Sequence, residues 1–374
     1  MLRASQKLLA LGARVFGRPR QAVLLPVQTY VAGRYLLPLA QLAHEMSIDV
    51  CYTLAPKLAR SAAGPRIRAA FDAHAREVDE VFAHRHRWQL IVVADHGHFR
   101  PLLLTGSPVA HIGHGNPSKL ADDADRLPWE YSRAPRRRDG TLGYAEMIEA
   151  SACVRDALVA AEPALADRIR VLGRLLDDVL LADAGRRAAL RDALGLAADL
   201  PVLMVASTIR ARSLFGMYWE PLLAQLRTLA DRYQIVLCAH PNEDAAWRQR
   251  LGDDPVLYLL PADVPAGKVL AVADLVLTDF SSLCQKAALL DVPMVFSRCE
   301  PLPVWPEGAT ARLYAHWPTW HPGISLDACL QRAAAMRDDP SREAIKAWVN
   351  TCPGQARALH QKWLARHFPP APTG

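Results

Sequence analysis

Short apolar runs alternate with longer stretches of helical periodicity along the whole chain. In the first half, the apolar runs lie at residues 22–27, 48–54, 89–95, 108–113 and 169–173, and the helical stretches lie around 31–45, 67–83 and 144–169. The segment 121–141 is rich in Pro, Arg and Asp and follows neither period, which predicts a long loop. Such alternation is typical of βαβ units and of a parallel sheet.

The second half of the chain repeats this plan. Its apolar runs lie at 201–207, 234–240, 255–260, 274–279 and 293–297, with helical stretches near 216–232, 267–272 and 282–291 and a further one at 341–367. Because a single hydrophobic core rarely grows beyond roughly 250–300 residues, a chain of 374 residues predicts two domains.

The boundary between the two halves is expected at Gly173. We predict an N-terminal segment (1–20), a Rossmann-like domain (21–172), a second Rossmann-like domain (173–340) and a helical segment (341–374) that packs back on the first domain. Two facing α/β domains of this kind, each with a parallel sheet, form the GT-B architecture of nucleotide-sugar transferases.

Polar motifs directly follow four of the predicted strands. In open parallel sheets ligands bind beyond the carboxyl ends of the strands, so these positions are candidates for a site. The motifs are His114-Gly115-Asn116-Pro117-Ser118-Lys119, Thr208-Ile209-Arg210, His240-Pro241-Asn242 and Thr278-Asp279-Phe280-Ser281-Ser282. Divided between the two halves, they predict an anion site that contains two histidines.

The last motif has the clearest physical rationale, because it leads into a helix whose free N–H groups attract phosphate. Ser281 and Ser282 would add hydroxyl donors. Each motif also has a structural interpretation: Asp279 or Ser281 can cap the helix, and His240 can simply end a strand. Arg210 and Lys119 can be solvated charges, and Gly115 can serve only a turn.

The N-terminus is basic and amphipathic. With about 100° between successive residues of a helix, Arg3, Lys7, Arg14 and Arg18 share one face, while Leu2, Leu9 and Phe16 lie opposite and Leu11 lies among the basic residues. Three interpretations fit this segment: an interfacial membrane helix, an organelle transit peptide, or a solvated helix that packs on its own domain.

Composition narrows the class of protein. Hydrophobic residues make up 51% of the chain, and no apolar run reaches the roughly 20 residues that span a bilayer. The 44 basic and 38 acidic residues give a net charge of +6, which suits anionic substrates or an acidic membrane surface. The seven cysteines form no CxxC pair, so neither a disulfide framework nor a zinc site is indicated and a reducing cytoplasm fits.

Several common sites have no motif in this sequence. There is no G-x-G-x-x-G or G-x-x-x-x-G-K pattern, so ordinary dinucleotide and P-loop sites are not indicated. The Arg-rich segment 133–138 lacks interleaved aromatic residues, which disfavours a nucleic-acid partner.

Taken in order, the four motifs resemble those of the CDP-glycerol glycerophosphotransferase family, which builds glycerol-phosphate teichoic acids and related capsule polymers. In that family a W-H-G-T-P-L-K-like motif, an A-P-T-W-R-like strand end, an H-P pair and T-D-Y-S-S follow one another at similar separations. Here the matching segments are 113–119, 206–210, 240–241 and 278–282, and the apolar sequence up to residue 297 is also similar.

This sequence departs from the family pattern at several positions. Gly113 and Asn116 replace Trp and Thr, and Leu175-Leu176 replaces Pro-Arg, although the aspartate that follows is kept as Asp178. Lys286 stands where the family usually carries an aspartate, in a region that contacts the nucleotide ribose in GT-B enzymes.

The resemblance implies a GT-B enzyme with an acceptor-binding first domain and a donor-binding second domain. It would transfer a polyol phosphate, such as glycerol phosphate, from a CDP-alcohol to a lipid-linked or cell-envelope polymer and release CMP. His114 would be the base, and His240 would hydrogen-bond the transferring phosphate. Arg210, Ser281 and Ser282 would hold the phosphates with Thr278 and Asp279 of the same motif, and Lys119 would support them. No D-x-D cluster is evident, so we expect no cofactor or structural metal and leave a loosely bound Mg²⁺ open.

Two alternatives remain open at the level of sequence. One is a GT-B glycosyltransferase with a nucleotide-sugar donor, which Lys286 favours. The other is a noncatalytic relative that binds phosphorylated polymers, which the presence of both His114 and His240 disfavours. For the glycerophosphotransferase and the glycosyltransferase alike, we expect a cytoplasmic protein that is peripherally bound to the inner face of the cell membrane. The Arg133–Arg138 loop would be a second contact with that membrane.

Overall fold

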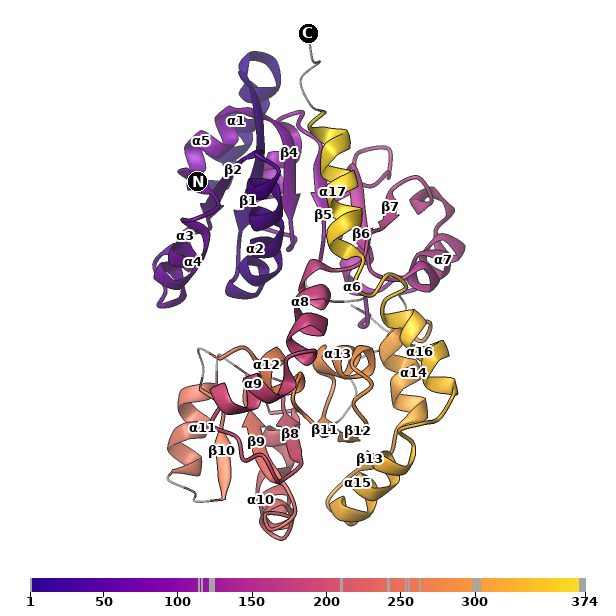
Figure 1. Cartoon of the computed structure of the whole chain (residues 1–374). Coiled ribbons are helices and arrows are strands. Elements are labelled where there is room, and N and C mark those ends of the chain that lie inside the picture. The colour runs from indigo at the N-terminus through magenta and orange to yellow at the C-terminus, as the bar shows by residue number, and fades with distance from the viewer. Residues whose placement is uncertain are drawn as a thin grey trace. The chain divides into compact units, whose positions relative to one another are not determined.

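The chain folds into two compact units, here called the first unit and the second unit (Figure 1). This computed structural model describes residues 2–113, 115, 117–120, 125–208, 211–240, 243–252, 254, 256–261, 264–297, 299 and 304–369. The first unit comprises residues 1–115, 126–178 and 354–374, and the second comprises 116–125 and 179–353. The first unit thus extends past the expected boundary at residue 172, and residues 341–353 belong to the second unit rather than packing on the first.

The first unit is built on a parallel sheet. Its strands are β1 (Pro19–Val27), β2 (Asp49–Leu54), β3 (Arg76–Glu77), β4 (Arg87–Val93), β5 (Val109–His111), β6 (Glu146–Glu149) and β7 (Ile169–Val171). They lie in the order β3-β2-β1-β4-β5-β6-β7, and each neighbouring pair is parallel. The strand order reverses between β1 and β4, which makes this point the topological switch point where such sheets bind ligands.

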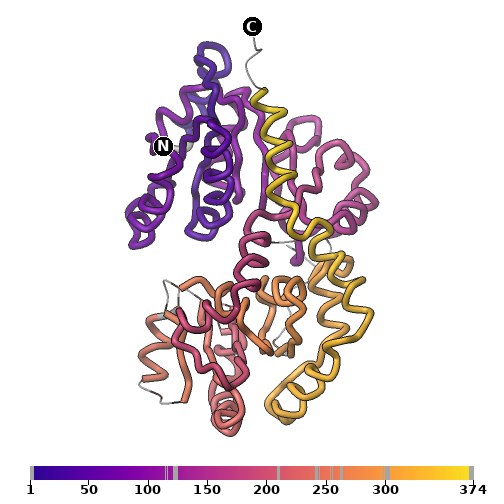
Figure 2. The backbone as a smooth tube through the Cα atoms, in the orientation of Figure 1, coloured from indigo at the N-terminus to yellow at the C-terminus, as the bar shows by residue number. Residues whose placement is uncertain are grey.

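Helices cover this sheet. They are α1 (Leu2–Phe16), α2 (Tyr30–Glu45), α3 (Pro56–Ala59), α4 (Ala63–Phe71), α5 (Glu80–Arg85), α6 (Trp129–Ser132), α7 (Ala152–Ala161) and α17 (Ala356–His367), with 3-10 turns at Arg100–Leu104 and Pro163–Leu165; α8 (Leu175–Ala184) begins in this unit. Figure 2 shows the backbone of α17 running along the unit as the last helix of the chain. Trp363 and Leu364 of α17 join the buried core, and the indole Nε1 of Trp363 donates to Oε2 of Glu146 at 2.6 Å.

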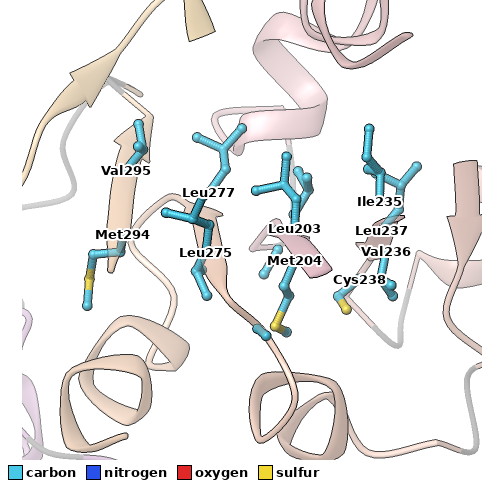
Figure 3. Packing of buried hydrophobic residues seen from close by; sticks show 14 of the residues in the cluster. Leu203, Met204, Ile235, Val236, Leu237, Cys238, Leu275, Leu277, Met294 and Val295 are labelled. Atoms are coloured by element: carbon cyan, nitrogen blue, oxygen red, sulfur yellow. The ribbon is translucent and has the colours of Figure 1, made fainter. Parts of the chain in front are cut away.

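The second unit repeats the strand order of the first. Its strands are β8 (Val202–Ala206), β9 (Gln234–Cys238), β10 (Leu257–Leu259), β11 (Leu275–Thr278), β12 (Met294–Ser297) and β13 (Thr319–Trp320), in the order β10-β9-β8-β11-β12-β13. Buried side chains of the four inner strands form its core, as Figure 3 shows for Leu203, Leu237 and Leu277. The second switch point lies between β8 and β11, where Thr278 pairs with Ala206.

The helices of the second unit are α9 (Arg187–Ala193), α10 (Leu214–Arg227), α11 (Asp244–Leu251), α12 (Ala266–Leu270), α13 (Leu283–Leu289), α14 (Ala309–His316), α15 (Leu326–Ala335) and α16 (Ser341–Val349). Two Rossmann-like units with parallel sheets, and a last helix that returns to the first, confirm the predicted GT-B class of α/β fold.

Three predicted helices are wrong in detail. The stretch 67–83 divides into α4, β3 and α5, because Asp79 caps a new helix by accepting from the N–H of Phe82 at 2.8 Å. The stretch 144–169 begins with β6, whose Met147 and Ile148 are buried in the sheet. The stretch 341–367 is broken into α16 and α17, with Gly354 at φ 73° between them.

Candidate active site

Asp279 lies at the switch point of the second unit, between β8 and β11. It follows β11, is only 1% exposed, and receives hydrogen bonds from the loop that follows β8. Its Oδ2 accepts from the N–H of Thr208 (2.9 Å), the hydroxyl of Thr208 (3.0 Å) and the N–H of Leu214 (2.9 Å). Burial raises the pKa of this carboxyl, while these hydrogen bonds and the charge of Lys119 act in the opposite direction.

The carboxylate of Asp279 therefore holds both described ends of the loop between Ser207 and Leu214. Ser207 and Ser213 add to this, because Ser207 Oγ accepts from the N–H of Phe215 at 3.1 Å and Ser213 caps α10. The predicted ligand-binding residue Arg210 belongs to this loop by sequence but lies outside the described residues. Asp279, predicted to contact substrate, is buried and positions this loop.

The rest of the Thr278–Ser282 motif differs in exposure. Thr278 is fully buried, and its hydroxyl oxygen has no hydrogen-bond partner in the described structure. Ser281 is half-buried and accepts from the N–H of Leu283 at 3.2 Å, so it caps α13 as its structural interpretation predicts. Ser282 is exposed at the start of the same helix and makes no side-chain cap bond. Ser282 is thus the member of the motif with its hydroxyl at the surface.

Lys119 belongs to the second unit, in a short segment (116–125) that lies in the sequence between two parts of the first unit. It forms an antiparallel bridge with Val304, and the carbonyl of Ser118 accepts from the N–H of Trp305 at 3.0 Å. Burial raises the pKa of both Asp279 and Cys284, and the positive charge of Lys119 acts against both shifts. The structure therefore brings Lys119 into electrostatic range of the Thr278–Ser282 motif.

His240 is half-buried just beyond the carboxyl end of β9. Its carbonyl accepts from the N–H of Glu243 at 2.8 Å. Burial lowers the pKa of the imidazole, and the charge of Glu243 opposes that shift only in part. A histidine in this state is neutral near pH 7, so it can accept a proton and donate a hydrogen bond through its N–H group. The other predicted histidine, His114, lies outside the described residues.

The switch point of the first unit carries a threonine–aspartate pair that the sequence analysis missed. The hydroxyl of Thr29 donates to Oδ2 of Asp95 at 2.8 Å and accepts from the N–H of Ala32 at 3.0 Å, capping α2. Thr29 is exposed and Asp95 is half-buried. Asp95 opens the sequence Asp-His-Gly-His directly after a predicted strand, so the same rule of polar residues at strand ends would have found it.

The residue after Asp95, His96, belongs to a stack of polar aromatic rings. His96 Nε2 donates to the carbonyl of Glu130 at 2.8 Å, because a carbonyl can only accept, and Nδ1 lies 2.8 Å from the hydroxyl of Tyr144. The rings of His96 and His111 stack with centroids 4.5 Å apart. Both ring nitrogens of His96 thus have partners, which fixes the orientation of the ring.

A buried ion pair lies at the ends of β6 and β7. Arg174 and Glu149 approach within 3.6 Å, and Tyr131 donates its hydroxyl to Glu149 Oε1 at 2.7 Å. Burial nonetheless raises the pKa of Glu149 to about 7. Arg174 also donates to the carbonyl of Ile112 at 3.4 Å, two residues before His114 in the sequence. Neither Glu149 nor Arg174 belonged to a predicted motif.

Two further searches concern metals and membranes. In the described ranges, no group of three His, Cys, Asp or Glu side chains is arranged to hold a metal ion. Nor does any described helix have the length and apolar character needed to cross a membrane.

The comparisons with known structures agree with this fold. A variant of the wall teichoic acid polymerase TagF, soaked with CDPG, superposes with a TM-score of 0.68 at 17% sequence identity, over 98% of this chain and 94% of that one. TagF itself gives 0.66 at 14% identity over the same shares of the two chains. The UDP-GlcNAc 2-epimerase of Neisseria meningitidis, bound to UDP-GlcNAc, gives 0.57 at 15% identity over 92% of this chain and 100% of that one. At these low identities the superpositions show the shared GT-B fold alone.

The family comes from a comparison of sequences. A search of curated proteins found no match. The model of the family described as CDP-glycerol:poly(glycerophosphate) glycerophosphotransferase matches residues 104–300, more than half of the chain, and this span contains all four polar motifs. The chain therefore belongs to the CDP-glycerol:poly(glycerophosphate) glycerophosphotransferase family.

Proposed function

We propose that this transferase moves a polyol phosphate, with glycerol phosphate as the first candidate, from a CDP-alcohol to a lipid-linked or cell-envelope polymer. The observation that carries the proposal is the edge of the second unit, where Lys119, His240, Ser281 and Ser282 accompany a loop fixed by Asp279. Family membership and the likeness to TagF support the same class of reaction.

In the proposed reaction an acceptor hydroxyl oxygen attacks the phosphorus that carries the polyol. The new P–O bond forms as the bond to the bridging diphosphate oxygen breaks, and CMP leaves with that oxygen. His114 takes the proton of the acceptor hydroxyl, and His240 donates a hydrogen bond to the transferring phosphate. Because its pKa is lowered, His240 is neutral near pH 7 and donates through its one ring N–H.

The remaining predicted residues hold the diphosphate. Arg210 and Lys119 supply positive charge, and the hydroxyl groups of Ser281 and Ser282 donate hydrogen bonds. Thr278 and Asp279 are buried and would act indirectly. Asp279 holds Thr208 and Leu214, the described ends of the loop to which Arg210 belongs by sequence. The proposal uses no resident cofactor, since the cations of this chain neutralise the donor and positioning supplies the catalysis.

Helix α1 suits an anionic membrane surface, but through a different face from the expected one. Gln6, Ala10 and Ala13 are buried against the first unit, whereas Leu8 and Val15 are each 71% exposed and Phe16 is 86% exposed. At helical spacing Leu8 and Val15 lie opposite the buried face, and the exposed Lys7 and Arg14 lie beside them, whereas Arg18 follows the end of the helix. Helix α1 is thus both a packing helix and a candidate interfacial helix.

The membrane part of the proposal has its own test. Leu8→Ser with Val15→Ser should abolish cosedimentation with anionic vesicles containing phosphatidylglycerol, while Ala10→Ser, on the buried face, serves as the matched control. Equal binding of the wild type and the double variant, or no binding by either, would leave α1 with only a packing role.

The reaction itself is tested by incubating the purified chain with CDP-alcohols, UDP-sugars and CMP-sugars and measuring the nucleotide released. CMP formed from CDP-glycerol, with phosphorus transferred to the acceptor, is the expected result. Turnover of a nucleotide-sugar, without transfer of phosphorus, would instead support the glycosyltransferase that Lys286 favours. No turnover of any donor would support the noncatalytic alternative.

A further inference from the structure

We propose that Thr29 and Asp95, at the switch point of the first unit, form a binding subsite for hydroxyl groups at the polyol end of the acceptor. This inference rests on the proposed function, because it assigns the first unit to an acceptor that ends in a polyol. It concerns residues outside the four motifs and outside the span matched by the family model.

The position of the pair is the first argument. Thr29 follows β1 and Asp95 follows β4, which are adjacent parallel strands on either side of the point where strand order reverses. Side chains at that point face the crevice in which open α/β sheets bind their ligands. The exposed Thr29 and the half-buried Asp95 are both in reach of a ligand there.

The backbone around Asp95 is held in one conformation. The side chain of Gln28 clamps the following turn, because its Oε1 accepts from the N–H of His98 at 2.8 Å and its Nε2 donates to the carbonyl of His96 at 3.2 Å. Gly97 has φ +125°, and a Cβ there would lie 3.3 Å from the Gln28 amide. A turn fixed from both sides presents Asp95 at low cost in conformational entropy on binding.

The chemistry of the pair selects hydroxyl groups over phosphate. A carboxylate repels a phosphate but accepts hydrogen bonds from hydroxyl donors, and its two oxygens suit neighbouring hydroxyl groups of a polyol. Arg100 lies close enough for its charge, like that of Asp95, to act on the hydroxyl of Tyr144. A carboxylate with a cation in its surroundings therefore suits a ligand that carries both hydroxyl groups and a phosphate.

Steady-state kinetics test this subsite. Asp95→Asn keeps the shape of the side chain but removes its charge, and we expect the KM for the acceptor to rise roughly 10-fold or more, since hydrogen bonds to charged groups are the stronger ones. The KM for the CDP-alcohol and the slow release of CMP without acceptor should stay within twofold. Asp79→Asn is the control, because Asp79 is an aspartate of the first unit that caps α5 and follows neither β1 nor β4.

Direct binding separates this inference from the proposed function. Calorimetry or ligand-observed NMR with glycerophosphoglycerol as the probe should show binding to the wild type, binding to Asp79→Asn and loss of binding in Asp95→Asn, with circular dichroism confirming that each variant is folded. This readout needs no turnover, so it holds even if CDP-glycerol proves not to be the donor. An unchanged affinity in Asp95→Asn, or an equal rise in the KM values of donor and acceptor, would overturn the subsite.

Discussion

Both units have a threonine–aspartate hydrogen bond at the point where strand order reverses. In the first unit the hydroxyl of Thr29 donates to Asp95 at 2.8 Å, and in the second the hydroxyl of Thr208 donates to Asp279 at 3.0 Å. In each case the threonine follows the first strand of the unit in chain order and the aspartate follows the fourth. The burial and the hydrogen-bond partners of the two aspartates differ, however.

The difference lies in how deeply each carboxylate is buried and in the backbone N–H groups that Asp279 holds. Asp279 is buried and also accepts from the backbone N–H groups of Thr208 and Leu214, whereas Asp95 is half-buried beside an exposed threonine. A buried carboxylate that accepts from backbone N–H groups positions a loop, whereas a half-buried one lies where a ligand can reach it. An aspartate at a strand end therefore gains its meaning from its hydrogen bonds, which the sequence alone does not display.

The largest expected effect is on stability. Asp279→Ala leaves the N–H groups of Thr208 and Leu214 without their acceptor in a buried place, which should cost about 4 kcal/mol of unfolding free energy. Asp95→Ala should cost less, about 1 kcal/mol, because this carboxylate is half-buried and its bond to the exposed Thr29 can be replaced by water. Urea denaturation monitored by tryptophan fluorescence measures both, and equal costs would contradict the comparison.

The two predicted histidines follow strands of different units in the sequence, His114 after β5 and His240 after β9. Replacing either with alanine should lower turnover by about two orders of magnitude, roughly 3 kcal/mol in the barrier, because each takes part in proton transfer or phosphate binding. His321→Ala, in a turn of the second unit, is the control. A variant that keeps near-wild-type turnover would remove its histidine from the mechanism.

Glu149 tests the electrostatics of the first unit. Burial raises its pKa to about 7, so the folded state keeps a proton that the unfolded chain has lost above about pH 4.5. The free energy of unfolding should therefore fall by about 2 kcal/mol between pH 5 and pH 7 because of this group. Glu149→Gln should flatten that part of the profile.

Glu146, on the same strand, behaves in the opposite way and provides the control. Hydrogen bonds from His367, Trp363 and Arg170 lower its pKa to about 2, so it stabilises the fold at neutral pH and loses that contribution as the pH falls below about 4.5. Glu146→Gln should therefore change the acid side of the profile, and a profile between pH 5 and pH 7 that is unchanged by Glu149→Gln would contradict the assignment.

The smallest expected effect is on donor affinity. Ser281→Ala and Ser282→Ala should each weaken binding of the CDP-alcohol by about 1 kcal/mol, roughly fivefold, with the effect of Ser282 wholly on binding because it caps nothing. Acceptor affinity should not change. Calorimetry checks both, and unchanged donor affinity would leave Ser281 with only the capping role.

Long apolar strands were predictable from sequence, because strands buried on both faces read as continuous apolar runs. Strands β8, β9 and β11 lie where expected to within two residues. Strand β6 was missed because Glu146 and Glu149 give it the appearance of a helix start. Their partners lie further along the chain, in β7, in α17 and at Arg174. Strand β13 has only Thr319 and Trp320, too few to show a period.

The candidate site was predictable to the level of residue type. Polar residues at strand ends were visible as motifs, and the structure places Lys119, Asp279 and His240 at the second unit. The role of Asp279 was not visible, because its hydrogen bonds join residues about 70 positions apart. Arg174 and Glu149 escaped notice for the same reason: each is an ordinary charge until the fold buries it.

The route of the chain also constrains the order in which the protein is made. The chain passes between the two units after residues 115, 125, 178 and 353. During synthesis, all of the second unit has been translated before α17, which supplies Trp363 and Leu364 to the core of the first. The second unit can therefore mature on the ribosome while the first still lacks part of its core, and a truncation before α17 should leave the first unit, rather than the second, dependent on chaperones.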